Sequence, residues 1–376
     1  MIKATVISRG KHANNNRMFT REMPANTQWR GNSHWSDVNV TWYNQSAAAG
    51  ISLYTPDLLP PRQADVILFI DLPLDRKDIQ QVKEQNSGAP LILLLKESPL
   101  FPYWFRPENH SDFAYVFTYN HKLVDHERYF ELKLPKSFPP ENGSPRNFSE
   151  RKPVVLLNTN YYRGIKSFPT PLHYLKRLYT FRKRGWQFTF RDALATDQKL
   201  LYQERRNFAR EALQKDSGIL DIYGRGWEGQ RYTWYYRFFP DKPYVDYPAF
   251  FEGEKLELLS SYRFVFAYEN YRGDVGYISE KMFDAFYAGA VPIYLGDENI
   301  TNHVPKECFV DARDFKNLKS IAEYIQNCDE QTWLKKRKAI DDFIESDQIK
   351  PFLPDAHAEQ IIRIIKKAVK KETITA

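Results

Sequence analysis

Cysteine and long apolar runs are both scarce in this chain. Its 376 residues include only two cysteines, Cys308 and Cys328, which excludes a scaffold held together by disulfides. The longest apolar runs, 66–70 and 91–95, have the length of a buried strand and are far short of the ~20 residues that span a bilayer. The first ten residues lack the apolar stretch of a secretory signal. Together these absences predict a cytoplasmic protein.

Common ligand motifs are missing as well. We find neither a Gly-Lys-Ser/Thr phosphate loop nor a Gly-x-Gly-x-x-Gly turn in the loop at 271–277, and no zinc-finger spacing. No Asp-x-Asp metal motif stands at a suitable strand end, so we expect no bound metal. The formal net charge of +7 favours anionic partners, but its lysines and arginines lie in short clusters typical of solvated helix faces. Nucleic acid is therefore not an expected partner.

Short apolar segments recur along the chain with helical or loop material between them. They predict strands at 4–8, 38–42, 65–70, 90–95, 114–117, 154–157, 219–223, 263–268 and 291–295. Nearly continuous apolar strands are expected where helices cover both faces of a parallel sheet. The pattern predicts an α/β protein with two Rossmann-like domains facing a cleft, the GT-B type of arrangement. Binding proteins and kinases share such a plan, so architecture alone does not decide the function.

A cluster of prolines and glycine at 134–153 predicts the linker between the domains. We expect an N-terminal acceptor-binding domain at 1–140, a C-terminal donor-binding domain at 150–345 and a C-terminal amphipathic helix or tail at 346–376. Helices are expected at 170–184, 197–215, 279–289, 315–328, 330–345 and 355–371. The last of these is basic, and two roles stay open for it: packing across the domain junction, and peripheral attachment to a membrane surface.

The segment from Tyr262 to Ile300 carries the strongest chemical signal. A buried strand at 263–268 is followed by Glu269 and Asn270, then by a loop with two glycines, then by the start of a helix at Glu280 and Lys281. Free backbone N–H groups and the positive end of the helix dipole make such a helix start an anion site. A lysine in the first turn has the wrong sign for the dipole unless an anion lies between them. The alternative is an exposed lysine with no ligand.

Three parts of this segment resemble a known signature. They read Phe-Ala-Tyr-Glu-Asn at 266–270, Gly-Tyr-Ile-Ser-Glu-Lys-Met-Phe-Asp-Ala at 276–285, and Ala-Gly-Ala-Val-Pro-Ile-Tyr-Leu-Gly at 288–296. This resembles the family 10 glycosyltransferases, the α-1,3/α-1,4-fucosyltransferases that use GDP-fucose. Ser279 replaces the family's usual threonine and keeps the hydroxyl. Weaker similarity lies at 221–227, at Lys-Glu-Ser-Pro in 96–99 and at 113–120, whereas the first 60 residues match nothing recognisable.

The resemblance implies an inverting transfer from GDP-fucose, or from another GDP-sugar, to a hydroxyl of an oligosaccharide or lipid-linked glycan. No cofactor is required, and a divalent cation is expected at most as a stimulant. The implied donor-binding residues are Arg206, Arg225, Glu269, Asn270, Tyr277, Glu280 and Lys281. Lys281 and an arginine would neutralise the diphosphate, with Arg205 and Arg210 as alternatives to Arg206. Glu280 would bind ribose hydroxyls, because a carboxylate accepts two charge-assisted hydrogen bonds from a vicinal diol.

The general base is expected in the first domain. Glu97 follows the apolar strand at 90–95 and would face the cleft, and His121 is a second candidate. Some bacterial family members have a glutamate two positions earlier, where this chain has Leu95. A non-catalytic carbohydrate- or nucleotide-binding protein of the same fold is the competing hypothesis.

Overall fold

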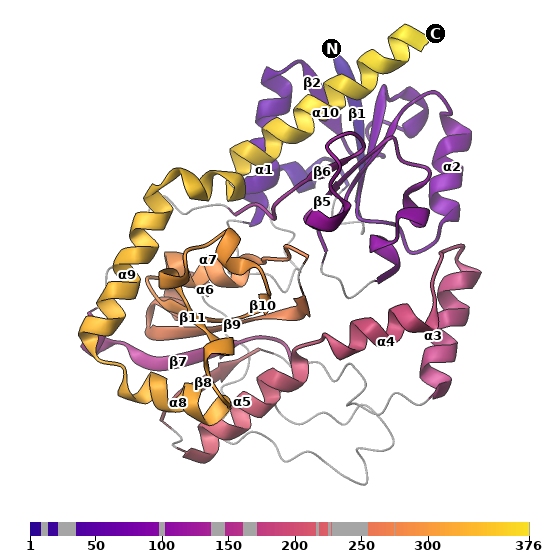
Figure 1. The fold of residues 1–376 in the computed structure, drawn as a ribbon. Helices are drawn as coiled ribbons and strands as arrows, with labels where there is room; N and C mark the ends of the chain where they lie inside the picture. Colours follow the sequence, from indigo (N-terminus) through magenta and orange to yellow (C-terminus); the bar gives the residue numbers. More distant parts are fainter. Residues whose placement is uncertain are drawn as a thin grey trace.

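The chain folds around two parallel β-sheets. The computed structural model describes residues 1–8, 14–21, 35–97, 102–136, 147–160, 171–215, 218–224, 227, 255–273 and 275–375. Arg225, one of the predicted donor-binding residues, lies outside them. Helices flank both sheets (Figure 1), and every strand pairing between the named strands is parallel. The predicted α/β class is confirmed.

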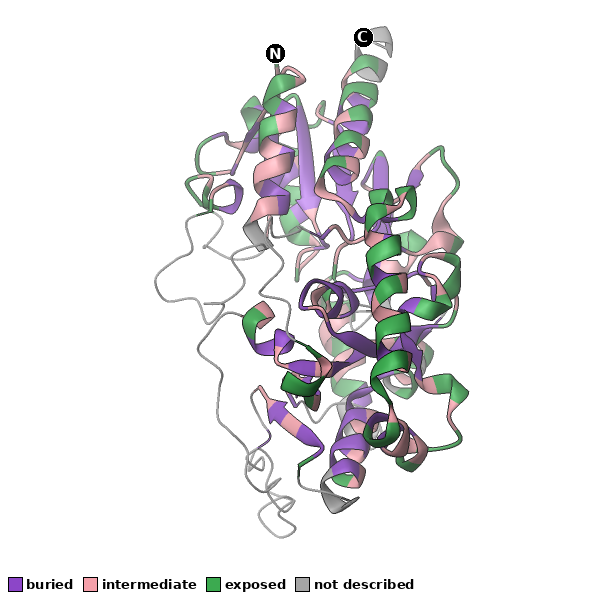
Figure 2. Ribbon diagram, turned by 90° about the vertical axis from the view of Figure 1, so that its left-hand side faces the viewer, coloured by how far each residue is buried: buried purple, intermediate pink, exposed green. Residues whose placement is uncertain are grey.

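The first sheet has the order β2-β1-β3-β4-β5-β6. Its strands are β1 Ile2–Ile7, β2 Ile51–Tyr54, β3 Val66–Ile70, β4 Leu91–Leu94, β5 Tyr115–Thr118 and β6 Tyr129–Glu131. The central strands β3 and β4 are almost fully buried, since apolar side chains on both of their faces are covered. Figure 2 shows buried residues concentrated on the strands and exposed residues on the outer sides of the helices. Helix α2, Lys77–Gln85, lies on the face that contains Ile67 and Phe69.

The second sheet has the order β11-β10-β9-β7-β8. Its strands are β7 Lys152–Leu157, β8 Leu220–Tyr223, β9 Tyr262–Gly273, β10 Val291–Asp297 and β11 Val310–Asp311. Around it lie α5 Tyr202–Lys215, α6 Lys255–Ser260, α7 Glu280–Tyr287, α8 Leu318–Asn327 and α9 Glu330–Glu345. Central β9 is longer than the predicted strand at 263–268. Glu269 and Asn270 therefore lie within the strand, near its carboxyl end.

Two later parts of the chain return to the first sheet. Helices α3, Pro171–Lys183, and α4, Phe190–Gln198, enclose Trp186 and Phe188, which share a core cluster with Phe69. After the short helix η12, Asp347–Phe352, helix α10, Pro354–Thr375, runs alongside α1, Trp35–Ala48 (Figure 1). The first domain's core is thus completed by residues that lie between β7 and β8 and by residues that follow the second sheet in sequence.

Two expectations change in the light of this packing. The predicted strand at 38–42 is wrong: these residues lie inside α1. Val38 and Trp42 are four positions apart and both buried, so helical burial prevails over the strand preference of β-branched residues. On α10, the apolar Ile361, Ile364 and Ile365 are buried against the first sheet, so its apolar face is not available to a membrane. No helix in the described residues is both long and apolar enough to cross a membrane.

Candidate active site

The carboxylate of Glu269 organises the junction between β9 and α7. It is fully buried and accepts hydrogen bonds from the Ser279 backbone N–H, at 2.7 Å to Oε1, and from the Ser279 hydroxyl, at 2.6 Å to Oε2. Ser279 also caps α7, since its hydroxyl accepts from the Lys281 N–H. The Lys281 ammonium lies 3.4 Å from Glu269 Oε2 and 3.0 Å from the Ser279 hydroxyl. Glu269 is therefore occupied by protein partners and orients Lys281.

Glu280 and Lys281 stand side by side in the first turn of α7. Lys281 Nζ lies 3.7 Å from Glu280 Oε1, and the Glu280 side chain is 48% exposed. Loss of hydration opposes ionisation of Glu280, but the lysines Lys281, Lys136 and Lys255 hold its pKa well below the usual value. The site thus presents an ionised carboxylate to solvent beside a largely buried ammonium, both at a helix N-terminus.

The arginines of α5 divide into two environments. Arg205 is buried, and its guanidinium donates to the Tyr268 carbonyl at 2.6 Å and to Asn270 Oδ1 at 2.9 Å. Arg206 is equally buried but points to another strand end, where it donates to Asn160 Oδ1 at 3.3 Å. Arg210 is exposed. Of the predicted residues, Asn270 is therefore brought together with Arg205, whereas Arg206 lies beside the end of β7.

The glycine loop before α7 lies directly against the first domain. Gly276 has φ +80°, and a Cβ there would come within 2.5 Å of the Tyr119 carbonyl oxygen. Its N–H donates to the buried Asp297 carboxylate at 2.5 Å. Next to it, the Tyr277 ring meets the Tyr119 ring with centroids 5.1 Å apart. The loop between β9 and α7 is thus in contact with the residue that follows β5, and burial raises the pKa of Tyr277 well above its usual value.

Glu97 lies on the first-domain side of this contact. It is exposed, and Asp71 Oδ1 fixes its loop by accepting from the Lys96 and Glu97 N–H groups at 2.7 and 3.0 Å. The Tyr119 hydroxyl donates to the Glu97 carbonyl at 2.7 Å. The negative charge of Glu97 contributes to the raised pKa of Tyr277. The structure therefore places the predicted base beside the Gly276–Tyr277 loop.

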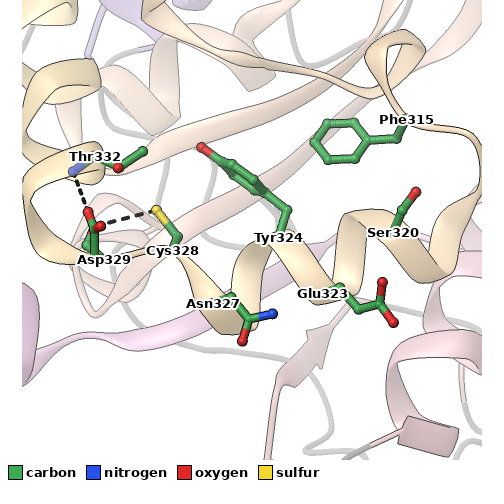
Figure 3. Close-up of a pocket in the computed structure, with 8 residues that line it drawn as sticks. All are labelled: Phe315, Ser320, Glu323, Tyr324, Asn327, Cys328, Asp329 and Thr332. Atoms are coloured by element: carbon green, nitrogen blue, oxygen red, sulfur yellow. Dashed lines mark hydrogen bonds between the residues drawn. The ribbon is translucent and has the colours of Figure 1, made fainter.

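Other features of the described residues do not join this site. A surface pocket on α8 and the turn before α9 contains Tyr324, Cys328 and Asp329 (Figure 3), but none of the predicted site residues. No group of three or more His, Cys, Asp or Glu side chains that could hold a metal ion occurs in the part of the chain that the structure describes.

Several residues that contribute to the site were missed from the sequence. Asp71, Tyr119 and Asp297 each directly follow an apolar strand or end one, a position where a polar side chain is a usable signal. Lys136 carries no such local signal, since its role depends on an ion pair with Glu280 across the domain junction.

Two Rossmann-like sheets whose carboxyl ends meet at a helix N-terminus define the GT-B architecture of glycosyltransferases. Residues 196–336 match the family model described as glycosyltransferase family 10 (fucosyltransferase), C-terminal part. This match includes β9, α7 and β10, and it confirms the resemblance predicted from the sequence.

Curated relatives match over shorter stretches of the chain. Identity is 38% over 72 residues with the α-(1,3)-fucosyltransferase FucT of Helicobacter pylori, covering 19% of this chain and 15% of that protein. It is 39% over 85 residues with mouse α-(1,3)-fucosyltransferase 4, covering 22% and 19%. It is 37% over 68 residues with an α-(1,4)-fucosyltransferase of Arabidopsis thaliana, covering 18% and 17%. The match thus spans less than a quarter of each relative's length.

Similarity of fold extends over the whole chain. A crystal structure of an α1,3-fucosyltransferase aligns with a TM-score of 0.50 and 16% identity, covering 98% of this chain and 89% of that one. Anabaena HepE, solved with UDP and glucose, aligns with a TM-score of 0.52 and 10% identity, covering 98% and 100%. At these identities the alignments establish the GT-B fold.

Proposed function

We propose that this protein transfers fucose from GDP-fucose to a hydroxyl of a glycan, with inversion at the anomeric carbon. The observation that carries the proposal is the ordered unit of Glu269, Ser279, Glu280 and Lys281 at the start of α7, within the segment that matches the fucosyltransferase family. It combines a buried ammonium for a diphosphate with an exposed carboxylate for a diol. The acceptor is an oligosaccharide or a lipid-linked glycan.

The reaction is a single displacement. The acceptor oxygen forms a bond to the anomeric carbon while the bond from that carbon to the β-phosphate oxygen breaks, and GDP leaves with the electron pair. A base takes the proton of the acceptor hydroxyl. Negative charge grows on the diphosphate in the transition state, so cations held in place beforehand lower the barrier.

The roles on the donor side follow from the positions of the charges. Lys281, held by Glu269, binds the diphosphate, and an arginine of α5 assists it. Arg205 is favoured over Arg206 for that role because its guanidinium donates hydrogen bonds to Asn270 and to the Tyr268 carbonyl near the end of β9. Glu280 binds the ribose diol and Tyr277 packs near the nucleotide. Glu269 acts as a positioning residue for Lys281.

Glu97 is proposed as the general base. Its backbone is fixed by Asp71 and Tyr119, while its side chain remains exposed on the side of the Gly276–Tyr277 loop. His121, whose Nδ1 lies 3.5 Å from the Cβ position of Gly276, is the second candidate. Glu97→Gln should lower kcat by about 10²- to 10⁴-fold with little change in GDP affinity, the range expected for general-base catalysis.

The decisive experiment combines donor and acceptor. The protein is incubated with GDP-fucose and glycans ending in galactose, N-acetylglucosamine or glucose, and product masses are read by mass spectrometry. A mass gain of one fucosyl group, lost in Lys281→Ala, supports the proposal. GDP-mannose in a parallel series tests another GDP-sugar, and added EDTA tests whether a divalent cation stimulates.

A non-catalytic nucleotide- or carbohydrate-binding protein would give a different result. It would bind GDP, detected as a rise in Tm, but release neither GDP from GDP-fucose nor any fucosylated product. Absence of a Tm rise at millimolar GDP would remove the GDP-sugar assignment altogether.

A further inference from the structure

Lys136 is a buried cation on the segment that leaves the first sheet. Only 10% of its side chain is exposed, and burial lowers the pKa of its ammonium. Among the described residues its one ion pair is with Glu280, with 3.9 Å between Lys136 Nζ and Glu280 Oε2. This separation is longer than a hydrogen bond. The ammonium has therefore lost most of its water without gaining a hydrogen-bonded carboxylate from the part of the chain that the structure describes.

The position of Lys136 is set by η12, which follows the second sheet, and by α7, which lies between β9 and β10. Its N–H donates to the Phe352 carbonyl of η12 at 2.7 Å. Its ammonium lies 6.0 Å from the centre of the Phe283 ring on α7, and that ring packs on Phe352 with centroids 4.8 Å apart. Two separate parts of the chain, η12 and α7, thus hold Lys136 beside the start of α7.

The Glu280 carboxylate lies between two ammonium groups. Lys281 Nζ is 3.7 Å from Oε1, and Lys136 Nζ is 3.9 Å from Oε2. About half of the Glu280 side chain is exposed, so its oxygens stay accessible to ligand hydroxyls. A charge on each side restricts rotation of the carboxylate and favours its ionised form, which is the form that accepts two hydrogen bonds from a diol.

We propose that Lys136 is a positioning residue that holds Glu280 ready for the ribose diol of a nucleoside diphosphate, and so links the interdomain segment to donor binding. This inference rests on the proposed function. Glu280 lies in the segment that matches the fucosyltransferase family, whereas Lys136 lies outside that segment. Donor affinity therefore depends on how the two domains are joined.

The test compares GDP affinity by calorimetry in Lys136→Met, Lys136→Gln and Lys136→Arg, with Lys336→Met as a matched control. Lys336 is another partly buried lysine of the second domain, but it donates to the Phe309 carbonyl at 2.7 Å. We expect Lys136→Met to raise the Kd for GDP about tenfold, equivalent to about 1.4 kcal/mol. Lys136→Arg should restore affinity to within about threefold, and kcat at saturating donor should change less than about twofold.

A double-mutant cycle separates positioning from a structural role. In the Glu280→Gln background, Lys136→Met should have almost no further effect, because no carboxylate remains to be held. An equal loss in both backgrounds, or unchanged affinity in Lys136→Met, would overturn the inference. Lys136→Gln carries a neutral polar side chain one atom shorter than lysine, and it provides a second variant if Lys136→Met lowers the Tm. Failure of the unsubstituted protein to bind GDP would instead refute the proposed function, and the inference with it.

Discussion

At the scale of single residues, the proposed chemistry depends on Lys281 and on Glu269, which holds it. The Lys281 side chain is 14% exposed, and its ammonium contacts the Glu269 carboxylate and the Ser279 hydroxyl. The ammonium is therefore in place before any ligand binds. We expect Lys281→Met to lower transfer by at least about 10²-fold, because a cation aimed at developing charge contributes most in the transition state. Initial rates with GDP-fucose and a glycan acceptor measure this loss.

Stability is the control for that substitution. Glu269 keeps its two hydrogen bonds from Ser279 when Lys281 is replaced, so the Tm of Lys281→Met should stay within about 4 °C of the parent, a shift that corresponds to about 1 kcal/mol. Lys306→Met, which removes an exposed lysine paired with Asp314, should leave both rate and Tm unchanged. Full activity in Lys281→Met would remove Lys281 from the mechanism.

Gly276 offers a second test at the same scale. Gly276→Ala places a side chain at φ +80° and pushes a Cβ to 2.5 Å from the Tyr119 carbonyl oxygen. The control is Gly50→Ala, which has a φ of +79° but no atom within 4 Å of the new Cβ. Strain at positive φ should cost each variant about 1 kcal/mol of unfolding free energy, and the clash should add about 1–3 kcal/mol at Gly276 alone.

Denaturant unfolding of the two variants measures the difference. Activity provides an independent readout, because only the Gly276 substitution displaces the loop that carries Tyr277. Equal losses of stability in the two variants would contradict the close contact between this loop and the end of β5.

At the scale of elements, helix α10 packs against α1 through a buried histidine. His357 is 2% exposed and its ring meets Trp42 edge-on, with 6.5 Å between centroids. Neither ring nitrogen has a hydrogen-bond partner in the described part of the chain. Burial, with a further contribution from the nearby Lys96 charge, lowers the pKa of His357 well below its usual value. Helix α10 therefore packs against α1 with the His357 imidazole in its neutral form.

This arrangement predicts a loss of stability on acidification. His357 takes up a proton below about pH 6.5 in the unfolded chain but not in the folded protein. Protonation therefore stabilises the unfolded state more and more as the pH falls. Between pH 7 and pH 5 the free energy of unfolding should fall by about 2 kcal/mol from His357. Burial also lowers the pKa of His110, to about 4, so this residue adds a similar amount.

His357→Met separates the two contributions. The variant retains an apolar side chain at the α1–α10 contact, and its decline between pH 7 and pH 5, measured by urea unfolding, should be about 2 kcal/mol smaller than that of the parent. A decline identical to that of the parent would show that His357 is protonated within the folded protein.

Local signals explain which elements could be predicted. The unit from β9 to β10 is built from consecutive residues, so its strand, glycine loop, cap and lysine can all be recognised in one stretch. Helix α1 was mistaken for a strand because its burial depends on α10, more than 300 positions later. Lys136 escaped prediction for the same reason, because it acts on a residue of the other domain. Tyr119 follows directly after a strand, which is a usable signal, but its contact with Tyr277 of the other domain has no local signal.

At the scale of the whole molecule, the two domains share their chain. Trp186 and Phe188 complete one face of the first sheet, and Ile361 and Ile364 complete the other. All four follow the expected linker at 134–153, and the α10 residues follow the entire second sheet. The hydrogen bond from the Lys136 N–H to the Phe352 carbonyl also joins the end of the first domain to the segment before α10. Without the rest of the chain, the first sheet keeps α1 and α2 but loses part of its cover on both faces.

This sharing predicts that the domains cannot be separated at the linker. A fragment of residues 1–150 should fail to fold, because burial of a large aromatic or aliphatic side chain contributes about 1.5–3 kcal/mol and several would be lost together. The measurement is the dispersion of its amide NMR resonances and the cooperativity of its thermal unfolding. Co-expression with residues 151–376 should restore a folded complex that binds GDP.

The matched control cuts the chain without removing anything. A protease site inserted at Asn142 and cleaved after folding should leave the two pieces together in size-exclusion chromatography, because α3, α4 and α10 still cover the first sheet. The Kd for GDP should then stay close to that of the uncleaved protein, unless cleavage displaces Lys136 from Glu280. A stable, cooperatively unfolding fragment of residues 1–150 would contradict this shared core and make the first sheet an independent domain.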